Sequence, residues 1–152
     1  MAKSTAKVTE FETKSSLGTV AVGRKLLELL TPPKLLILRG DLGTGKTTLV
    51  KGIAAALGAA DPDEVTSPTF TLVHEYAGVL DGKPVKLLHL DLYRLEGERQ
   101  LDSLGFDDML TPDAIVLVEW GEKFKSIRKR ANGEIAISSV GGDARKIVVT
   151  LN

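Results

Sequence analysis

Cysteine is absent from the sequence, and histidine occurs only twice, at His74 and His89. Without cysteine the chain forms neither a disulfide framework nor a thiolate metal site, and it has no cysteine nucleophile. A reducing cytosol is compatible with this composition. The two histidines fall in segments predicted to be strands and have no companion ligand at metal spacing. We therefore interpret both as strand side chains with satisfied hydrogen bonds rather than as metal ligands or bases.

Long apolar runs and an excess of one charge are also missing. No segment reaches the roughly 18 consecutive apolar residues of a membrane span, and residues 1–10 lack the apolar core of a secretory signal. We expect a cytoplasmic protein with no membrane contact. Lysine and arginine number 20, as do aspartate and glutamate, so the overall charge predicts no affinity for DNA or RNA. Any contact with nucleic acid must be local.

The remaining composition is typical of an ordinary globular domain. The 152 residues are 43% hydrophobic and 26% charged, and they show no internal repeat or shift in composition. We expect one domain over residues 1–152, in which residues 1–7 form a flexible N-terminus.

The most informative segment is a Gly-rich loop at residues 40–48, with the pattern G-x-x-x-x-G-K-T. An apolar run at residues 35–38 precedes it, and apolar residues at helical spacing follow it: Leu49, Val50, Ile53, Ala54 and Leu57. The predicted order of strand, loop and helix is the context that a phosphate-binding loop requires. An ordinary glycine turn that caps a helix is the alternative, and the context favours nucleotide binding.

The residue types of this loop explain its chemistry. Gly40, Gly43 and Gly45 allow successive N–H groups to turn inward around phosphate oxygens, and the start of the following helix adds its own N–H groups and positive dipole end. Lys46 supplies a compact charge for the β- and γ-phosphates, and the Thr47 hydroxyl is a predicted Mg²⁺ ligand. The expected nucleotide contacts in the loop are Asp41, Leu42, Gly43, Thr44, Gly45, Lys46, Thr47 and Thr48.

The first half of the chain predicts further strands and a helix around this loop. Alternation at residues 8–14 predicts an edge strand. Ser15 or Ser16 caps a helix that ends at residues 31–33, Thr-Pro-Pro. Its expected apolar positions are Leu17, Val20, Leu27 and Leu30. A turn leads into a strand within residues 65–76, and a hairpin turn at residues 77–84 leads to an antiparallel strand at residues 85–93.

The second half completes an α/β pattern. Short helices are expected at residues 96–104 and 106–110, a strand buried on both faces at 114–118, and a helix or loop at 121–130. Alternating strands at residues 134–140 and 146–151 predict a C-terminal β-hairpin. Together the elements predict a P-loop NTPase-like three-layer sandwich with a mixed parallel and antiparallel central sheet.

Two acidic residues, Asp91 and Glu119, each end a predicted strand. Ligands in open α/β sheets collect at that edge, so Asp91 and Glu119 join Lys46 as predicted catalytic residues, and both carboxylates are candidates for Mg²⁺. An ordinary strand-end hydrogen bond for Asp91 and a helix-capping role for Glu119 are the alternatives. Spacing alone does not order the pair; we favour Glu119 because it ends the more apolar strand.

Three further features have both a functional and a structural interpretation. Thr69 either senses a γ-phosphate or bonds the backbone of its own turn. Residues 93–94, Tyr-Arg, form a charge clamp, or the arginine pairs with a nearby carboxylate. A basic cluster at residues 123–130 consists of Lys123, Lys125, Arg128, Lys129 and Arg130. A solvated face is its default interpretation, and contact with tRNA or an acidic partner is the alternative.

Four motifs together resemble the TsaE (YjeE) family of small bacterial P-loop ATPases. They are the Gly-rich loop, S-P-T-F-T-L-V at residues 67–73, H-L-D-L-Y-R-L at 89–95 and V-E-W at 118–120. The resemblance implies a role in forming threonylcarbamoyladenosine at position 37 of tRNAs that read codons beginning with A. It implies ATP and Mg²⁺ as cofactors and the TsaB–TsaD heterodimer as partner. ATP hydrolysis in such proteins supports turnover of the modifying complex without performing the carbamoyl transfer.

The resemblance also implies roles for individual residues. Lys46 and the loop amides hold the phosphates, Thr47 and Glu119 hold Mg²⁺, and Asp91 lies in the second strand-end motif. Residues 67–70 resemble a switch segment, and Trp120 is expected near the nucleotide. The family commonly has alanine where this chain has Thr44, which leaves the effect of Thr44 on nucleotide affinity open.

Two other functions compete with this hypothesis. A nucleotide-dependent docking module would use ATP to order its loops, with incidental hydrolysis. A small-molecule kinase is disfavoured because the sequence offers no candidate lid with paired arginines. No N-K-x-D string for reading guanine is present, which favours ATP over GTP.

Overall fold

The computed structural model describes residues 6–41, 43–69 and 71–152. The strands are β1 Lys7–Thr13, β2 Lys34–Arg39, β3 Val73–Leu80, β4 Lys83–Asp91, β5 Ala114–Glu119, β6 Gly133–Gly141 and β7 Ala144–Leu151. The α-helices are α1 Ser16–Leu26, α2 Lys46–Ala56, α3 Glu98–Leu104, α4 Phe106–Met109 and α5 Lys125–Arg130, and 3₁₀ turns cover Leu27–Leu29, Pro62–Glu64 and Gly121–Lys123. Residues 1–5 of the expected flexible N-terminus lie outside the described residues, and Lys7 already begins β1.

One seven-stranded sheet organises the chain, in the order β1-β7-β6-β2-β5-β4-β3. The central strands β6, β2, β5 and β4 run parallel, whereas β3 pairs with β4, β6 with β7, and β1 with β7 in antiparallel fashion. The predicted mixed sheet, the C-terminal hairpin and the edge position of β1 are confirmed.

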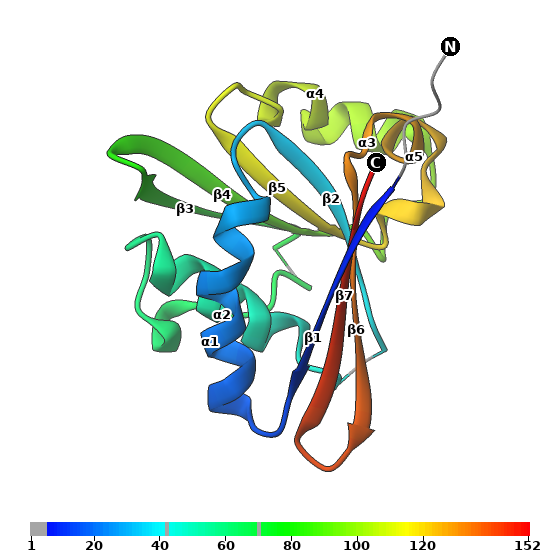
Figure 1. Cartoon of the computed structure of the whole chain (residues 1–152). Coiled ribbons are helices and arrows are strands. Elements are labelled where there is room, and N and C mark those ends of the chain that lie inside the picture. The colour runs from blue at the N-terminus through cyan, green and yellow to red at the C-terminus, as the bar shows by residue number, and fades with distance from the viewer. Residues whose placement is uncertain (1–5, 42, 70) are drawn as a thin grey trace.

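Helices cover both faces of this sheet, which makes the predicted three layers (Figure 1). On one face α1 and α2 bury a core that includes Leu26, Leu49 and Ile53 against the sheet. On the other face Leu101, Phe106 and Ile127, from α3, α4 and α5, pack against Val116 and other strand residues. Every residue of β5 is buried, as expected for the central apolar strand.

The hairpin between β3 and β4 differs from the prediction. Leu72 has a left-handed backbone, with φ of 69°, so the strand predicted within residues 65–76 begins only at Val73. The turn is two residues, Asp81 and Gly82, rather than residues 77–84. Both have positive φ, 52° and 78°, and a two-residue turn of this kind matches the twist of paired strands. The strands therefore extend almost to the turn.

The apolar positions predicted for the first helix were right only in part: Leu30, just beyond α1, is fully buried, and Leu27 packs against the core. Ser15 is the cap, since its Oγ accepts a hydrogen bond from the Gly18 N–H at 3.0 Å, but Leu17 is 83% exposed. The buried positions are Thr19, Val22, Gly23 and Leu26. Gly23 lies against the backbone of Gly52 in α2, where an added Cβ would come within 2.2 Å of the Gly52 carbonyl carbon. The face of α1 that contacts α2 contains the small residues Thr19 and Gly23, and such residues do not stand out in a pattern of apolar spacing.

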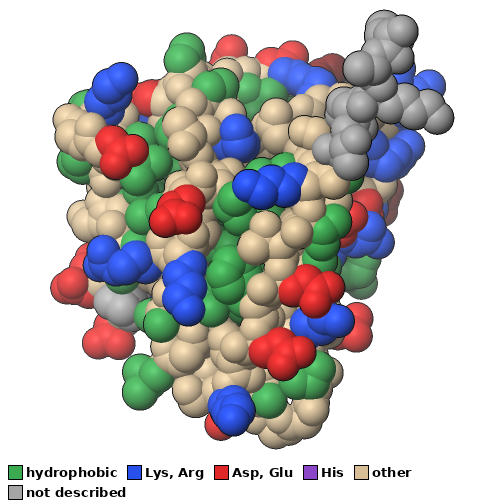
Figure 2. Space-filling model, viewed as in Figure 1, with side chains coloured by type: hydrophobic (Ala, Val, Ile, Leu, Met, Phe, Trp, Pro, Cys, Tyr) green, Lys and Arg blue, Asp and Glu red, His purple; other side chains and the backbone are tan. Residues whose placement is uncertain are grey.

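The topology brings three strand ends to one place. Because β2, β4 and β5 are parallel, the Gly-rich loop after Arg39 emerges beside Asp91 and Glu119, and Glu119 pairs in register with both Leu38 and Asp91. Acidic and basic side chains are interspersed over the face of the molecule seen in Figure 2, in keeping with the balanced composition. In the described part of the chain, no helix is long and apolar enough to cross a membrane.

Candidate functional site

The Gly-rich loop connects β2 to α2 at the edge of the sheet. Gly43 and Gly45 adopt left-handed backbone conformations, with φ of 80° and 103°, which glycine adopts at little steric cost. The Gly45 carbonyl accepts the first helical hydrogen bond, from the Leu49 N–H at 2.9 Å. Lys46 is the first residue of α2, so its side chain leaves the helix start next to the loop.

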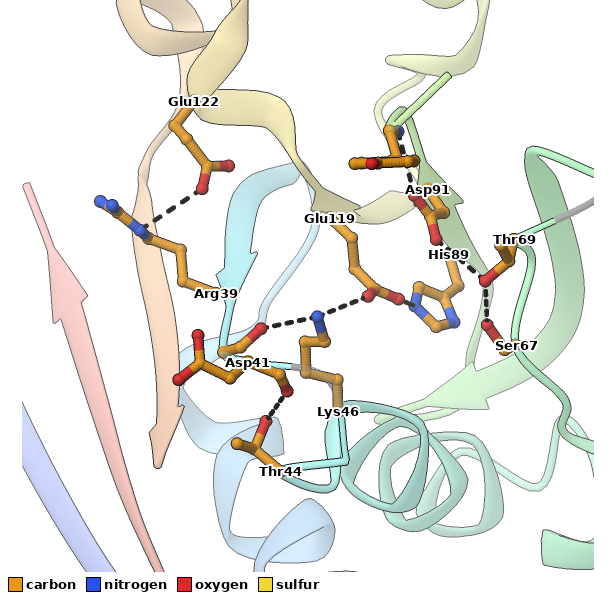
Figure 3. A network of polar contacts seen from close by, with 12 residues as sticks. Arg39, Asp41, Thr44, Lys46, Ser67, Thr69, His89, Asp91, Glu119 and Glu122 are labelled. Atoms are coloured by element: carbon orange, nitrogen blue, oxygen red, sulfur yellow. Dashed lines mark hydrogen bonds and ion pairs between the residues drawn. The ribbon is translucent and has the colours of Figure 1, made fainter. Parts of the chain in front are cut away.

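Lys46 joins the loop to the end of β5. Its Nζ donates to the Gly40 carbonyl at 2.7 Å and lies 3.1 Å from Oε1 of Glu119 (Figure 3). Both side chains are mostly buried, with exposed fractions of 14% for Lys46 and 6% for Glu119. Water screens such a pair only weakly, so the lysine charge and the carboxylate strongly influence each other.

Glu119 has a second partner in His89, a fully buried residue of β4. His89 Nε2 lies 2.6 Å from Oε2 of Glu119, and because an ionised carboxylate only accepts, Nε2 is the donor. His89 Nδ1 has no hydrogen-bond partner among the described residues. Burial acts to raise the pKa of Glu119, but the hydrogen bond and charge of His89, followed by those of Lys46, hold the pKa below its ordinary value of 4.5. The geometry favours an ionised carboxylate.

Asp91 binds the segment that precedes β3. Its Oδ2 accepts a hydrogen bond from Thr69 Oγ1 at 3.1 Å, and its Oδ1 accepts one from the Tyr93 N–H at 3.0 Å. The Thr69 hydroxyl also lies 2.7 Å from Ser67 Oγ. Thr69 therefore connects to a strand-end carboxylate as well as to its own turn (Figure 3). A substitution of Asp91 would remove the hydrogen bond that holds Thr69.

Two exposed aromatic rings stand beside these carboxylates. Tyr93 and Trp120 have ring centroids 5.3 Å apart at an interplanar angle of 55°. Trp120 has a left-handed backbone, with φ of 65°, and its side chain is 40% exposed. Lys123 Nζ donates to the carbonyls of Leu92, Tyr93 and Leu95 and so fixes the backbone that carries Tyr93.

These elements enclose a cleft of about 700 Å³. Its lining contains the predicted residues Asp41, Gly43, Gly45, Lys46, Thr47, Thr48, Thr69, Asp91, Glu119 and Trp120, together with Gly40, Ser67 and Tyr93. Leu42 and Phe70 lie outside the described residues. Thr44 is buried at 7% exposure, and its Oγ1 donates to the Asp41 carbonyl at 2.6 Å. The Thr44 side chain thus closes the loop on itself instead of facing the cleft.

Oxygen donors of the kind that Mg²⁺ prefers line this cleft: the Thr47 hydroxyl and the carboxylates of Asp91 and Glu119. No three His, Cys, Asp or Glu side chains in the described residues gather closely enough to hold a metal ion by themselves. Mg²⁺ in nucleotide sites typically takes one or two carboxylates and completes its shell with phosphate oxygens and water. The donor set therefore fits a metal bound together with a phosphate ligand.

Sequence reasoning missed the part played by His89. The interpretation as a satisfied strand histidine holds for His74, whose ring nitrogens contact Thr71 Oγ1 and the Thr66 carbonyl. His89 instead contacts Glu119, 30 residues away. His89 lies two residues before Asp91 on the same strand, and alternate strand residues share a face. This spacing is a sequence signal that places His89 on the same face of the sheet as the strand-end carboxylate.

The basic cluster at residues 123–130 is largely engaged within the chain. Lys123 binds three backbone carbonyls, Arg128 Nη1 donates to the Glu122 carbonyl at 2.6 Å, and Arg130 pairs with Asp107. All five side chains of the cluster are exposed, which agrees with the default interpretation of a solvated face.

A protein-family model described as "Threonylcarbamoyl adenosine biosynthesis protein TsaE" matches residues 13–147 of the chain. The chain belongs to the TsaE family. It is 37% identical to the tRNA threonylcarbamoyladenosine biosynthesis protein TsaE of Streptomyces coelicolor, over 85% of this chain and 87% of that one. Identity to the protein of the same name in Bacillus subtilis is 38%, over 87% and 78% of the two chains.

A solved structure shares the fold of this chain. The crystal structure of YdiB from Bacillus subtilis matches with a TM-score of 0.67 and 30% sequence identity, covering 98% of this chain and 88% of YdiB. The family expected from the four motifs is therefore confirmed, and with it membership in a TsaE family that takes part in tRNA threonylcarbamoyladenosine biosynthesis.

Proposed function

We propose that this TsaE-family protein binds Mg²⁺-ATP in the cleft and hydrolyses it to ADP and phosphate. In this proposal it acts as the ATPase partner of the TsaB–TsaD heterodimer during formation of threonylcarbamoyladenosine at position 37 of tRNAs that read codons beginning with A. The observation that carries the proposal is the convergence of the Gly-rich loop, Lys46, Asp91 and Glu119 on one cleft. Family membership supports the pathway.

Most residues of the cleft have a role in this proposal. The loop amides and Lys46 bind the phosphates, and Lys46 exchanges its contact with Glu119 for phosphate oxygens. Thr47 and Glu119 would hold Mg²⁺, which would supply positive charge to neutralise the phosphates. Both oxygens of each carboxylate have a partner in the structure, but Glu119 is the better metal candidate, because Lys46 frees Oε1 of Glu119 when it moves to the phosphates, whereas Asp91 keeps its hydrogen bonds from Thr69 and Tyr93.

Asp91 then serves the segment around Thr69. By holding the Thr69 hydroxyl, it places Ser67 and Thr69 on the wall of the cleft, where they contact the nucleotide phosphates. Trp120 and Tyr93 also line the cleft, with rings exposed for contact with the nucleotide or a partner protein. We expect turnover to be slow for the isolated protein and faster in the complex. The internal contacts of Lys123, Arg128 and Arg130 support an indirect relation to tRNA.

The test measures ATP turnover and tRNA modification with and without the TsaB–TsaD pair, for the wild type and Glu119→Gln. This substitution keeps the size of the side chain and removes the charge proposed to hold Mg²⁺. We expect the variant to bind the partner proteins and to lose both repeated turnover and repeated modification. If it retains ATP and partner binding and still supports repeated modification, the docking-module hypothesis is correct and hydrolysis is incidental.

A further inference from the structure

Arg145 of β7 reaches the Gly-rich loop, although 101 residues separate it from Thr44. Its Nε donates to the Thr44 carbonyl at 2.6 Å, and its Nη2 lies 3.4 Å from the Gly43 carbonyl oxygen. Its Nη1 donates to the Gly142 and Ala144 carbonyls at 2.6 and 2.9 Å and lies 3.4 Å from Ser139 Oγ. One guanidinium therefore ties the loop to the tip of the C-terminal hairpin.

The partners of Arg145 are all neutral oxygens. Within the described part of the chain, no carboxylate lies at ion-pair distance from this half-buried side chain. A guanidinium spreads its N–H groups in a fixed planar fork, which suits it to several carbonyls in different directions. The contacts indicate that Arg145 fixes the backbone of the loop and of the hairpin tip, and that it does not neutralise a carboxylate within the described residues.

The hydrogen bond to Thr44 determines the direction of a loop amide. In a trans peptide the carbonyl and the N–H of the next residue point in opposite directions. Because the Thr44 carbonyl points to Arg145, the Gly45 N–H points the other way, and Gly45 lines the cleft. Gly45 has a φ of 103°, which glycine adopts at little steric cost, and the hydrogen bond from Arg145 to the preceding carbonyl holds the peptide in this orientation.

The hairpin also forms a wall against the loop. An added Cβ on Gly40 would come within 2.8 Å of the Ile137 carbonyl oxygen, and one on Gly45 would come within 3.7 Å of Arg145 Nε. In Figure 1 the β6–β7 hairpin extends beside the segment that joins β2 to α2. The loop thus rests on Ile137 and is fastened there by Arg145.

We propose that Arg145 is a positioning residue for phosphate binding. It holds the Thr44 and Gly43 carbonyls on the hairpin side of the loop, so that the Gly45 amide faces the nucleotide phosphates. The inference rests on the proposed binding of Mg²⁺-ATP in this cleft, and it gives the C-terminal hairpin a part in that function.

Equilibrium binding of Mg²⁺-ATP and Mg²⁺-ADP by calorimetry tests this role in the full chain. The variants are Arg145→Met, Arg145→Lys and the matched control Lys146→Met, each measured well below its own unfolding midpoint. Lys146 is the next residue of β7, points to the other face of the strand and lies 3.9 Å from Glu10. A positioning role moves nucleotide affinity at constant fold, which a purely structural role does not.

We expect R145M to weaken binding of both nucleotides by about tenfold, as for the loss of one or two well-placed hydrogen bonds. R145K should behave like R145M, because the Arg145 contacts come from three nitrogens spread over a planar fork, and the single compact nitrogen of a lysine does not reproduce that spread. K146M should bind within about twofold of the wild type. In steady-state hydrolysis, R145M should raise KM and leave kcat within about twofold.

Three outcomes would overturn the inference. Wild-type affinity in R145M would show that the loop keeps its shape without the guanidinium. Wild-type nucleotide affinity in R145K would show that positive charge alone matters. If R145M fails to fold, R145K takes its place, with the same expected loss of about tenfold in nucleotide affinity. Absence of nucleotide binding by the folded wild type would overturn the proposed function itself, a result distinct from a loss confined to the Arg145 variants.

Discussion

Replacing Gly40 with alanine tests the packing of the Gly-rich loop against the hairpin. The Cβ of G40A would come within 2.7 Å of Thr44 Oγ1, 2.8 Å of Ile137 Cγ2 and 2.8 Å of the Ile137 carbonyl oxygen. Real Cβ atoms essentially never approach other heavy atoms to under 3.0 Å, so something must shift. Two of the three atoms belong to β6, and one of these is backbone that cannot rotate away.

The size of the effect follows from these contacts. Overpacking of this kind typically costs about 1–3 kcal/mol. If the loop moves to relieve it, the phosphate-binding amides move as well, and each 1.4 kcal/mol lost from binding is a tenfold loss of affinity. We therefore expect G40A to lower the free energy of unfolding by about 2 kcal/mol and to weaken Mg²⁺-ATP binding by at least about tenfold.

Chemical denaturation and nucleotide calorimetry measure the two effects. Gly97→Ser is the stability control, since no atom lies within 4 Å of an added Cβ there, its φ of −158° suits any residue, and serine is a favoured residue at this helix N-cap. Combining G40A with Thr44→Ala removes only one of the three contacts, so the double variant should lose less stability than the sum of the two single losses but should not reach wild-type stability. Full stability and affinity in G40A, or complete rescue by T44A, would refute the proposed wall formed by Ile137.

Three more predictions concern other parts of the structure. The pKa of Glu119 is lowered in the folded protein, so the stabilising effect of its charge should be complete above pH 4.5 and decline as the pH falls through the lowered value. On acidification the wild type should therefore lose more unfolding free energy than E119Q, and an equal pH dependence of the two proteins would contradict this. Gly52→Ala would place its Cβ 2.1 Å from the Val20 carbonyl oxygen, so we expect the free energy of unfolding to fall by about 3 kcal/mol or more, despite the better helix propensity of alanine. A higher melting temperature would contradict the close packing of α1 on α2. Thr44→Ala alone removes the 2.6 Å hydrogen bond to the Asp41 carbonyl and should cost about 1 kcal/mol of stability. Because the Thr44 side chain faces away from the cleft, ATP affinity should stay within about twofold of the wild type, and a large loss of affinity in calorimetry would contradict that orientation.

Features encoded in consecutive residues were predictable from the sequence. The Gly-rich loop, the buried strand β5 and the C-terminal hairpin each have a local signature of glycine spacing, apolar run or alternation. Asp91 and Glu119 were found because strand ends in a parallel sheet share an edge, which needs only the strands themselves.

Features that depend on strand register were not predictable in the same way. The contact between His89 and Glu119 exists because β4 and β5 pair in one particular register, with His89 opposite Leu117. Arg145 reaches Thr44 only because β6 packs beside β2 and turns back as β7. The exposed Leu17 shows the converse, since an apolar residue at plausible helical spacing lies off the face that backbone contact at Gly23 selects.

The most direct test of the proposed site is the Mg²⁺ dependence of ATP binding, measured by titration calorimetry for the wild type and Glu119→Gln. We predict one site per chain whose affinity rises with Mg²⁺ in the wild type and loses most of that dependence in E119Q. A folded wild type that binds no ATP, or an E119Q variant with unchanged Mg²⁺ dependence, would contradict the assignment of the cleft as a Mg²⁺-ATP site.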